Sequence, residues 1–422
     1  MQAIFPDSVS AYWRAMDAAT IKTLKEEPLP HEGFLRRAGE LFASLRSVGC
    51  ERDSAGNRKL FFNEYCSWIL FYAMTPIVQS LQALQEASDL KNLQQALGLR
   101  RFSLGSFSEA PAVFDADLLE PIAANLALQL QAKAIDPRLE ELYFTVHLVD
   151  STLLRTLPKL LRTFYHQRKD GGELHAWRVH MDLQVGLPAP ERFTVTGAHG
   201  REREDLGRHL RGGCCYVMDR GYQDVSLFNR IAAAGSRYVC RVRQNLRFTV
   251  LEELELSAED RAAGVLADQI VQIAPGRKEQ PNHPVRLITL KEEVHPKRVP
   301  RQKGVKKLSS GKLLVLSNLS AQEAAAEVVG LLFRYRWSIE LFFRFLKQIL
   351  GLRHLICQRE EGLRILLYCM VICCVLLELW TGQRPDLATM RMLQWYLLGV
   401  ASLEELQRFI ARRQQKKAKT PA

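Results

Sequence analysis

The pattern of hydrophobic and polar positions divides the chain into three parts. In the N-terminal part, apolar residues recur at helical spacing in long runs such as FNEYCSWILFYAMTPIVQSLQALQEA. From Leu142 the chain alternates in short strand-like runs, and helical spacing returns near Ala321. This pattern predicts an α-helical N-terminal domain over 1–134, an α/β core over 135–380 and a helical C-terminal region with a basic tail over 381–422.

The core is predicted to be a mixed sheet with helices packed on it. Strand-like and helical runs alternate in the order β-β-β-α-β-α-β. The strands are expected in YFTVHLVD, HAWRVHMDLQVGLP, ERFTVTGAH, CCYVMD and RYVCRVRQN, and the helices in EREDLGRHL and DVSLFNRIAAAG. The segment TLLRTLPKLLRTFYHQR, which follows the first strand, is expected to be a loop or a short helix.

Strand-like alternation continues over 245–319 and predicts a β-rich insertion within the core. Between His295 and Lys312, the segment HPKRVPRQKGVKKLSSGK carries seven Lys or Arg residues, broken by proline and glycine. It is expected to be an exposed loop, which is either a solvated hairpin tip or a contact to DNA.

The N-terminal domain contains a candidate DNA-reading motif in DLKNLQQALGLRRFSLGSFSEAPAVFDADLL. This segment predicts two short helices separated by a break between Gly98 and Gly105. A helix-turn-helix has this arrangement, but so does an ordinary pair of packed helices, which is the commoner case.

Composition adds a preference for an anionic partner. The 422 residues include 58 Lys plus Arg against 46 Asp plus Glu, a formal net charge of +12, and 47% are hydrophobic. The hydrophobic content predicts a globular protein with a large core. The positive charge favours nucleic acid through the release of counterions, although a basic protein that binds no nucleic acid has the same charge.

Three features predict a cytoplasmic protein without a membrane partner. The nine cysteines lie mostly in apolar runs and lack zinc-site spacing, so they are expected to be reduced core thiols. The start MQAIFPDSVSAYWRAMD lacks the basic and apolar regions of a signal peptide. The apolar run Ile365–Leu377 spans 13 residues, too few to cross a bilayer, and predicts a buried helix.

The segment LLFRYRWSIELFFRFLKQ, residues 331–348, aligns its charges along one side of a helix. At about 100° of rotation per residue, Glu340 lies about 40° and Lys347 about 20° from Arg336, with Phe333 on the same side. The helix is expected to bury its opposite, apolar arc and to present a base, an acid and a base to an anion. Arg336 would hold a phosphate in a two-pronged fork, and Lys347 as a point charge.

Two aspartates each end a predicted strand, Asp150 in VHLVDST and Asp219 in YVMDRGYQD. Taken singly, such a residue is more often a turn or helix cap, as we expect for Asp224. Together with Glu340, however, the two can gather at one edge of the sheet. Three close carboxylates repel one another unless a cation lies among them, which predicts Mg²⁺ or Mn²⁺. Two such ions about 3.5 to 4 Å apart can assist displacement at phosphorus.

These motifs resemble those of a known family. DST at Asp150, DRGY at Asp219, and the spacing of Arg336, Glu340 and Lys347 resemble the DDE transposases of bacterial insertion sequences. The match is to the IS-four branch, with its Y-x2-R-x3-E-x6-K signature, and it covers about half of the chain.

The sequence departs from this signature at one position. Phe333 stands where the branch has tyrosine, and Tyr335 follows two residues later. Phenylalanine keeps the aromatic surface but cannot donate a hydrogen bond to phosphate. Tyr335 is expected to take over this contact only where the helix begins irregularly.

The resemblance implies a ribonuclease H-like core, magnesium-dependent cleavage at the ends of a mobile element, and joining of the 3′ ends to target DNA. It implies that Asp150, Asp219 and Glu340 are the catalytic residues and bind two metal ions. Arg220, in the family's D-R pair, would contact phosphate unless it forms a surface salt bridge. The N-terminal domain would recognise terminal inverted repeats in double-stranded DNA, and two protomers would form a synaptic homodimer in the bacterial cytoplasm.

Two other functions fit the same residues. A ribonuclease H-like nuclease would hydrolyse DNA without joining it, and a DNA-binding repressor would have lost its metal site. The presence of all three acids argues against such a loss.

Overall fold

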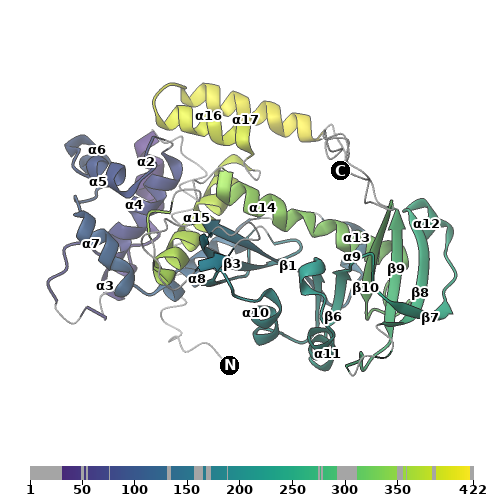
Figure 1. Cartoon of the computed structure of the whole chain (residues 1–422). Helices are drawn as coiled ribbons and strands as arrows, with labels where there is room; N and C mark the ends of the chain where they lie inside the picture. The colour runs from purple at the N-terminus through teal and green to yellow at the C-terminus, as the bar shows by residue number, and fades with distance from the viewer. Residues whose placement is uncertain are drawn as a thin grey trace, which may run out of the picture.

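The fold is built on one mixed sheet, with helices on both of its faces and a group of helices beside one end (Figure 1). This α/β architecture is that of a computed structural model of the chain. The structure describes residues 31–48, 52–53, 56–75, 77–130, 135–155, 165–167, 173–187, 189–273, 276, 279–291, 311–348, 355–357, 359–382 and 386–418. The start of the chain, on which the expectation about a signal peptide depends, lies outside these residues.

The core elements occur in the predicted order β-β-β-α-β-α-β, with one short strand added. That addition is the second strand, which pairs with the third and lies in the segment expected to be a loop or short helix. In chain order the elements are β1 (Thr145–Arg155), β2 (Tyr165–Gln167), β3 (Glu173–Gln184), β4 (Arg192–Gly197), α10 (Glu202–Arg208), β5 (Cys214–Met218), η4 (Arg220–Tyr222), α11 (Val225–Ala233) and β6 (Arg237–Arg241).

Residues 245–319 supply four more strands, as predicted, but these strands join the core sheet. They are β7 (Phe248–Glu253), β8 (Val265–Ile273), β9 (Val285–Lys291) and β10 (Lys312–Ser317). The whole sheet has the order β2-β3-β1-β5-β6-β10-β9-β8-β7, with β4 paired to β3. The short helix α12 (Ala258–Ala262) connects β7 to β8. Most of the basic segment that precedes β10 lies outside the described residues.

Strand β1 is longer than predicted, and this changes the position of Asp150. Asp150 was expected at the end of a strand, but it lies inside β1. The parallel pairing of β1 with β5 ends at Leu148, whereas its antiparallel pairing with β3 continues to Arg155. The long β1–β3 hairpin therefore keeps the chain extended past the point where β5 ends. Asp150 lies just beyond that point.

Helices cover both faces of the sheet because residues of the core strands alternate between two apolar clusters. In β1, Leu148 packs into a cluster on the side of α13 (Ala326–Tyr335) and α14 (Trp337–Gln348). The next residue, Val149, packs into the opposite cluster beneath α10 and α11. Figure 1 shows α14 crossing over β1 and β3 as the continuation of α13.

The N-terminal helices pack around a long apolar helix from the C-terminal half, α15 (Glu360–Thr381). Among the described helices, α15 is long and apolar enough to cross a membrane, but 89% of its apolar window is buried inside the protein. It is thus a buried helix, as predicted, although longer than the 13-residue run suggested. The N-terminal helices are α2 (His31–Glu40), α3 (Leu45–Val48), α4 (Phe62–Met74), α5 (Leu81–Ser88), α6 (Lys91–Leu97), α7 (Leu104–Glu109) and α8 (Glu120–Leu128).

The candidate helix-turn-helix corresponds to α6 and α7. Helix α7 has six residues, LGSFSE, without a basic side chain, and its Phe107 is fully buried. The two short helices each pack against α5. At the other end of the chain, α16 (Leu387–Leu397) and α17 (Leu403–Ala418) form a helical pair. The cysteines within the described residues are buried and form no disulfides, as predicted.

Candidate active site

Asp150 and Asp219 come together because β1 and β5 are parallel neighbours in the sheet. Asp219 directly follows β5, and Asp150 lies just past the end of the shared ladder. Both side chains line a pocket of about 500 Å³. Its other lining residues are Glu202, Arg220, Gly221, Tyr222 and Arg243.

Arg336 connects Asp150 to Glu340. It stands between α13 and α14, and it is only 7% exposed. One guanidinium nitrogen, Nη1, lies 3.6 Å from Oδ2 of Asp150, and the other, Nη2, lies 2.5 Å from Oε1 of Glu340. The Phe333 ring packs against the same guanidinium, with 5.4 Å from its centroid to Cζ. Acids from β1 and α14 thus share one buried cation.

The electrostatics of this site fit an additional positive charge. The pKa of Asp150 is raised from 3.8 to about 6. Burial is the main cause, and the charges of Glu202 and Asp219 act in the same direction, whereas the Ser151 N–H and Arg336 lower the pKa. In Asp219, Oδ1 is buried and accepts no hydrogen bond within the described residues. Its nearest ion-pair partner is Arg241, at 4.0 Å. A divalent cation would bind the Asp219 oxygen that lacks a hydrogen bond, and it would favour the charged form of Asp150.

Lys347 also faces β1, so both basic residues of the predicted stripe contact the same strand. Its Nζ donates to Oγ1 of Thr152 and, at 3.1 Å, to the carbonyl oxygen of Leu153. These acceptors follow Asp150 closely in β1. The two basic residues therefore contact the strand that carries the first aspartate, whereas Glu340 pairs with Arg336 and does not line the pocket of Asp150 and Asp219.

The remaining predicted residues divide into two groups. Arg220 is exposed beside the carboxylate pocket, and no described acid lies within ion-pair distance of it. Tyr335 is not brought to the site, because its hydroxyl accepts a hydrogen bond from the backbone N–H of Asp136 at 3.1 Å. Asp136 caps the short helix α9 (Pro137–Glu140). Tyr335 therefore does not take the place of a signature tyrosine at Phe333. Asp224 caps α11, as predicted, by accepting from the N–H of Leu227.

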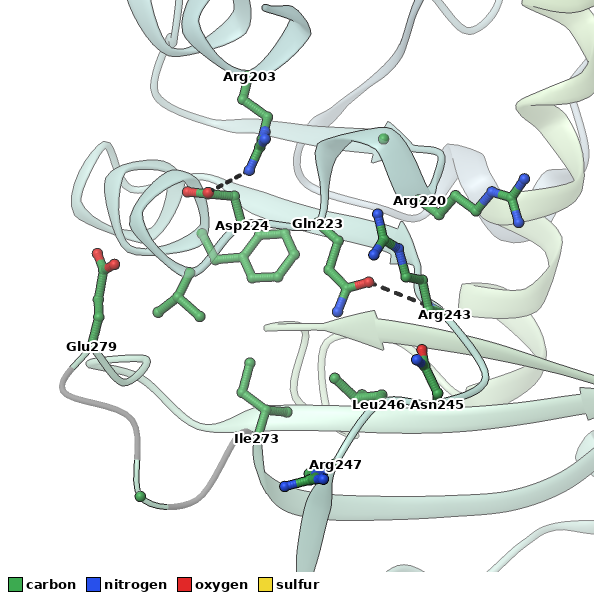
Figure 2. Close-up of a pocket in the computed structure, with 14 residues that line it drawn as sticks. Arg203, Arg220, Gln223, Asp224, Arg243, Asn245, Leu246, Arg247, Ile273 and Glu279 are labelled. Atoms are coloured by element: carbon green, nitrogen blue, oxygen red, sulfur yellow. Dashed lines mark hydrogen bonds and ion pairs between the residues drawn. The ribbon is translucent and has the colours of Figure 1, made fainter. Parts of the chain in front are cut away.

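A larger cavity of about 1040 Å³ adjoins the carboxylate pocket and shares Arg220, Gly221 and Arg243 with it. Figure 2 shows arginines from separate segments around this cavity. Arg203 is paired with Asp224 at 2.7 Å, whereas the other arginines form no ion pair with a described acid. The four arginines are Arg203, Arg220, Arg243 and Arg247, and the apolar lining consists of Val225, Phe228, Leu246 and Ile273. Such a lining suits a ligand that combines phosphate with apolar surface.

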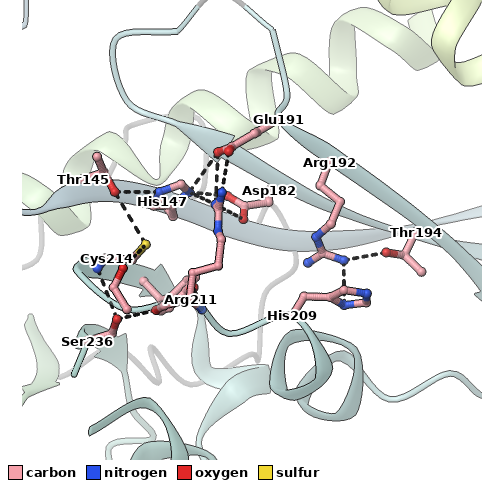
Figure 3. Close-up of polar contacts among 12 residues, drawn as sticks. Thr145, His147, Asp182, Glu191, Arg192, Thr194, His209, Arg211, Cys214 and Ser236 are labelled. Atoms are coloured by element: carbon pink, nitrogen blue, oxygen red, sulfur yellow. Dashed lines mark hydrogen bonds and ion pairs between the residues drawn. The ribbon is translucent and has the colours of Figure 1, made fainter. Parts of the chain in front are cut away.

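A second cluster with metal-binding side chains is formed around His147 of β1 and Asp182 of β3 (Figure 3). His147, Asp182 and Glu191 bring ligand atoms within 4.8 Å of one another. The Arg211 guanidinium already occupies this cluster, 2.5 Å from Glu191 and 3.4 Å from Asp182. Since Arg211 supplies the positive charge that a metal ion would bring, we regard the cluster as a buried polar network. The sequence pattern did not indicate it.

Glu202 is the site residue that sequence reasoning missed. It lines the carboxylate pocket from the first turn of α10. Its position follows no strand and no motif, so the chain pattern gave no reason to select it. The one signal was Gly221 in DRGY, whose missing side chain leaves space beside Glu202.

Carboxylates beside arginine-lined cavities are the kind of site found in proteins that act on phosphate-bearing substrates. The comparisons identify the family: residues 145–377 match the transposase DDE domain family, and the chain belongs to it. A predicted transposase, y4zB of Sinorhizobium fredii, is 25% identical over 62% of this chain and 67% of its own length. A predicted transposase for the insertion sequence element IS4SA of Synechocystis is 21% identical over 70% of this chain and 77% of its own.

Among solved structures, the piggyBac transposase synaptic complex with hairpin DNA aligns with 93% of this chain and 83% of its own. The TM-score is 0.41 and the sequence identity is 11%. The family match and the sequence relatives identify this chain as a DDE transposase.

Proposed function

We propose that this protein is an insertion-sequence transposase of the IS-four branch. It binds the terminal inverted repeats of its element, cleaves the DNA at the element ends and joins the 3′ ends to target DNA. One observation supports the proposal most directly: Asp150 and Asp219, from distant segments, line one pocket, and Arg336 links Asp150 to Glu340. A structural carboxylate has no need of two others beside it, because mutual repulsion raises the free energy of the folded state.

The sheet order supports a ribonuclease H-like core for this enzyme. Within the sheet, β4, β3, β1, β5 and β6 lie side by side. Strand β3 is antiparallel to β1, whereas β5 is parallel to β1, and β6 is parallel to β5. The two aspartates lie where the parallel pair β1–β5 ends, as an active site formed at a sheet edge requires.

We propose that Asp150, Asp219 and Glu340 hold two divalent ions, Mg²⁺ or Mn²⁺. The buried, unbonded Oδ1 of Asp219 and the raised pKa of Asp150 support a cation at this place. When bound, such ions activate an attacking water or hydroxyl and stabilise the leaving oxygen. The chain itself contributes orientation: Ser151 fixes one oxygen of Asp150 through its backbone N–H at 2.8 Å. Because Arg336 is almost fully buried, its guanidinium N–H groups stay directed at Asp150 and Glu340.

Basic side chains around the site would bind the DNA backbone. Arg336 and Lys347 lie on either side of Glu340, and Arg220 borders the pocket. The adjoining cavity adds three further arginines, and the formal net charge of +12 favours any nucleic acid. A DNA strand could therefore extend from the acids into the arginine-lined cavity.

The assembly and domain roles belong to the same proposal. Two protomers form a homodimer on paired element ends, and the helical residues up to about 134 recognise the terminal repeats. Residues 135–380 form the catalytic core with its insertion at 245–319, and residues 381–422 form the helical C-terminal region. The protein acts on nucleoid DNA in the bacterial cytoplasm.

The decisive experiment combines the purified protein, Mg²⁺ and a DNA fragment bearing the native element end. Joined products support the transposase, nicks without joining support a nuclease, and a shifted but uncut fragment supports a repressor. Asp150→Ala should abolish cutting while DNA binding remains close to that of the wild type. If binding falls as steeply as cutting, Asp150 is structural and the proposed role is wrong. Glu204→Gln is a control, because Glu204 is an exposed acid paired only with Arg201 among the described residues.

A further inference from the structure

Glu202 is a third carboxylate in the pocket of Asp150 and Asp219. It occupies the first position of α10, on the face of the sheet opposite α14. A glutamate in the first turn of a helix is commonly explained by its interaction with the helix dipole. That explanation does not account for the contacts of this side chain, which reach to β1, β3 and the turn after β5.

The first oxygen of Glu202 is fixed to the two central strands. Its Oε1 accepts from Oγ of Ser151 at 2.5 Å and from Nη1 of Arg178 at 2.9 Å. Arg178, on β3, also donates to Oγ of Ser151 at 2.9 Å. Ser151 in turn donates its backbone N–H to Asp150. The Oε1 atom of Glu202, which accepts two hydrogen bonds, is therefore bonded to Ser151, the residue that directly follows Asp150 in the chain.

The second oxygen of Glu202 lies against the turn that carries Asp219. A Cβ added at Gly221 would be 2.6 Å from Oε2 of Glu202, which is closer than real Cβ contacts allow. The backbone at Gly221 does not have a positive φ, so a side chain added here would be limited by space and not by conformation, and the Glu202 carboxylate would have to shift. The glutamate cannot move aside without losing Ser151 and Arg178. It is therefore wedged between the segment of Asp150 and the segment of Asp219.

We propose that Glu202 is a positioning residue of the metal site, which holds the Asp150 strand and the Asp219 turn at the separation that lets both carboxylates face one pocket. This inference rests on the proposed function, in which those carboxylates bind divalent ions. A site that is arranged before the ion arrives does not lose binding free energy in ordering its ligands. Residues that orient metal ligands in this way commonly change metal affinity about 10- to 100-fold when they are replaced.

The test measures Mn²⁺ binding to the full-length protein, by electron paramagnetic resonance of free Mn²⁺ and without DNA. Glu202→Ala should weaken Mn²⁺ binding about 10- to 100-fold. Glu202→Gln should lose less, because it keeps an oxygen for Ser151 while losing the charge that pairs with Arg178. The thermal midpoint and DNA affinity should stay close to wild-type values. Glu204→Gln, on the same helix, should leave Mn²⁺ binding unchanged.

A second pair of variants tests the contact itself. Gly221→Ala should also weaken Mn²⁺ binding, because the added methyl group displaces the Glu202 carboxylate. In the Glu202→Ala background, Gly221→Ala should weaken Mn²⁺ binding by less than about a further twofold, since the carboxylate that it displaces is gone. Additive effects would overturn the inference, as would Glu202→Ala and Glu202→Gln variants that bind Mn²⁺ as tightly as the wild type. Should the alanine variant fail to fold, the glutamine variant and Gly221→Ala decide.

Asp219→Ala separates this inference from the proposed function. If that variant loses Mn²⁺ binding while the Glu202 variants keep it, the metal site stands and only the role of Glu202 is wrong. If the wild type binds no Mn²⁺, or Asp219→Ala binds it normally, the proposed metal site itself fails.

Discussion

Asp150 should destabilise the metal-free protein near neutral pH, so that its replacement by asparagine should stabilise the fold. Asparagine has nearly the same shape and keeps an oxygen for the Ser151 N–H, which Asp150 accepts at 2.8 Å. It removes only the negative charge. That charge is buried beside two other carboxylates, and Arg336 at 3.6 Å offsets it only in part.

The magnitude follows from the pKa of Asp150, which is raised from 3.8 to about 6. At about 1.4 kcal/mol per pH unit, ionisation in the folded state is less favourable than in the unfolded chain by about 3 kcal/mol. Below pH 3.8 the carboxyl is protonated in both states, and it has no effect on stability. Between pH 3.8 and about 6 the unfolded chain releases the proton first, so stability falls as pH rises. Above about pH 6 the full loss is present.

The assay is thermal unfolding of wild type and Asp150→Asn in chelator between pH 5 and 8. The variant should unfold several degrees higher at pH 8, and the difference should shrink toward pH 5. Added Mn²⁺ should raise the midpoint of the wild type and reduce the gap, because an ion that binds only the folded state stabilises it. Equal midpoints at pH 8, or a gap that does not change with pH, would refute the reasoning. Glu204→Gln is the control for the loss of an exposed charge.

Three further substitutions test other contacts. Lys347→Ala should weaken binding to the element end and lower the slope of log affinity against log salt by about one, and an unchanged slope would exclude a phosphate contact. Arg336→Gln should tighten Mn²⁺ binding measured by calorimetry, because the guanidinium competes with the ion for the same acids. Its DNA affinity should fall. Weaker Mn²⁺ binding would contradict this competition. Arg286→Met should destabilise the protein by about 3 to 5 kcal/mol in urea unfolding, since it leaves Asp268 buried without its partner. A loss below about 1 kcal/mol would show that this pair contributes little.

Local pattern was sufficient for much of the core. The alternation of apolar residues located β1, β3, β4, β5 and β6, because strands with one or two buried faces need apolar residues at fixed spacing. The helical stripe was also readable: Lys347 does face the strand that carries Asp150. These features depend on neighbours in the chain, which a sequence displays directly.

Features that depend on pairing between distant segments were not predictable. The length of β1 is set by its hairpin with β3, so the sequence around Asp150 suggested a strand end that the pairing moves to Arg155. The short strand β2 forms only because β3 offers it an edge. Tyr335 illustrates the same limit, since its hydroxyl bonds to the backbone of a residue 199 positions earlier.

Glu202 shows why the carboxylate site could be predicted only in part. Asp150, Asp219 and Glu340 were selected because each occurs in a motif that resembles those of the transposase family. Glu202 has no motif, because a supporting contact can be made by any residue that reaches the right place. The sequence does contain one trace of this contact. Gly221 in DRGY has no side chain, and the Oε2 atom of Glu202, from another segment, lies where a Cβ would be crowded.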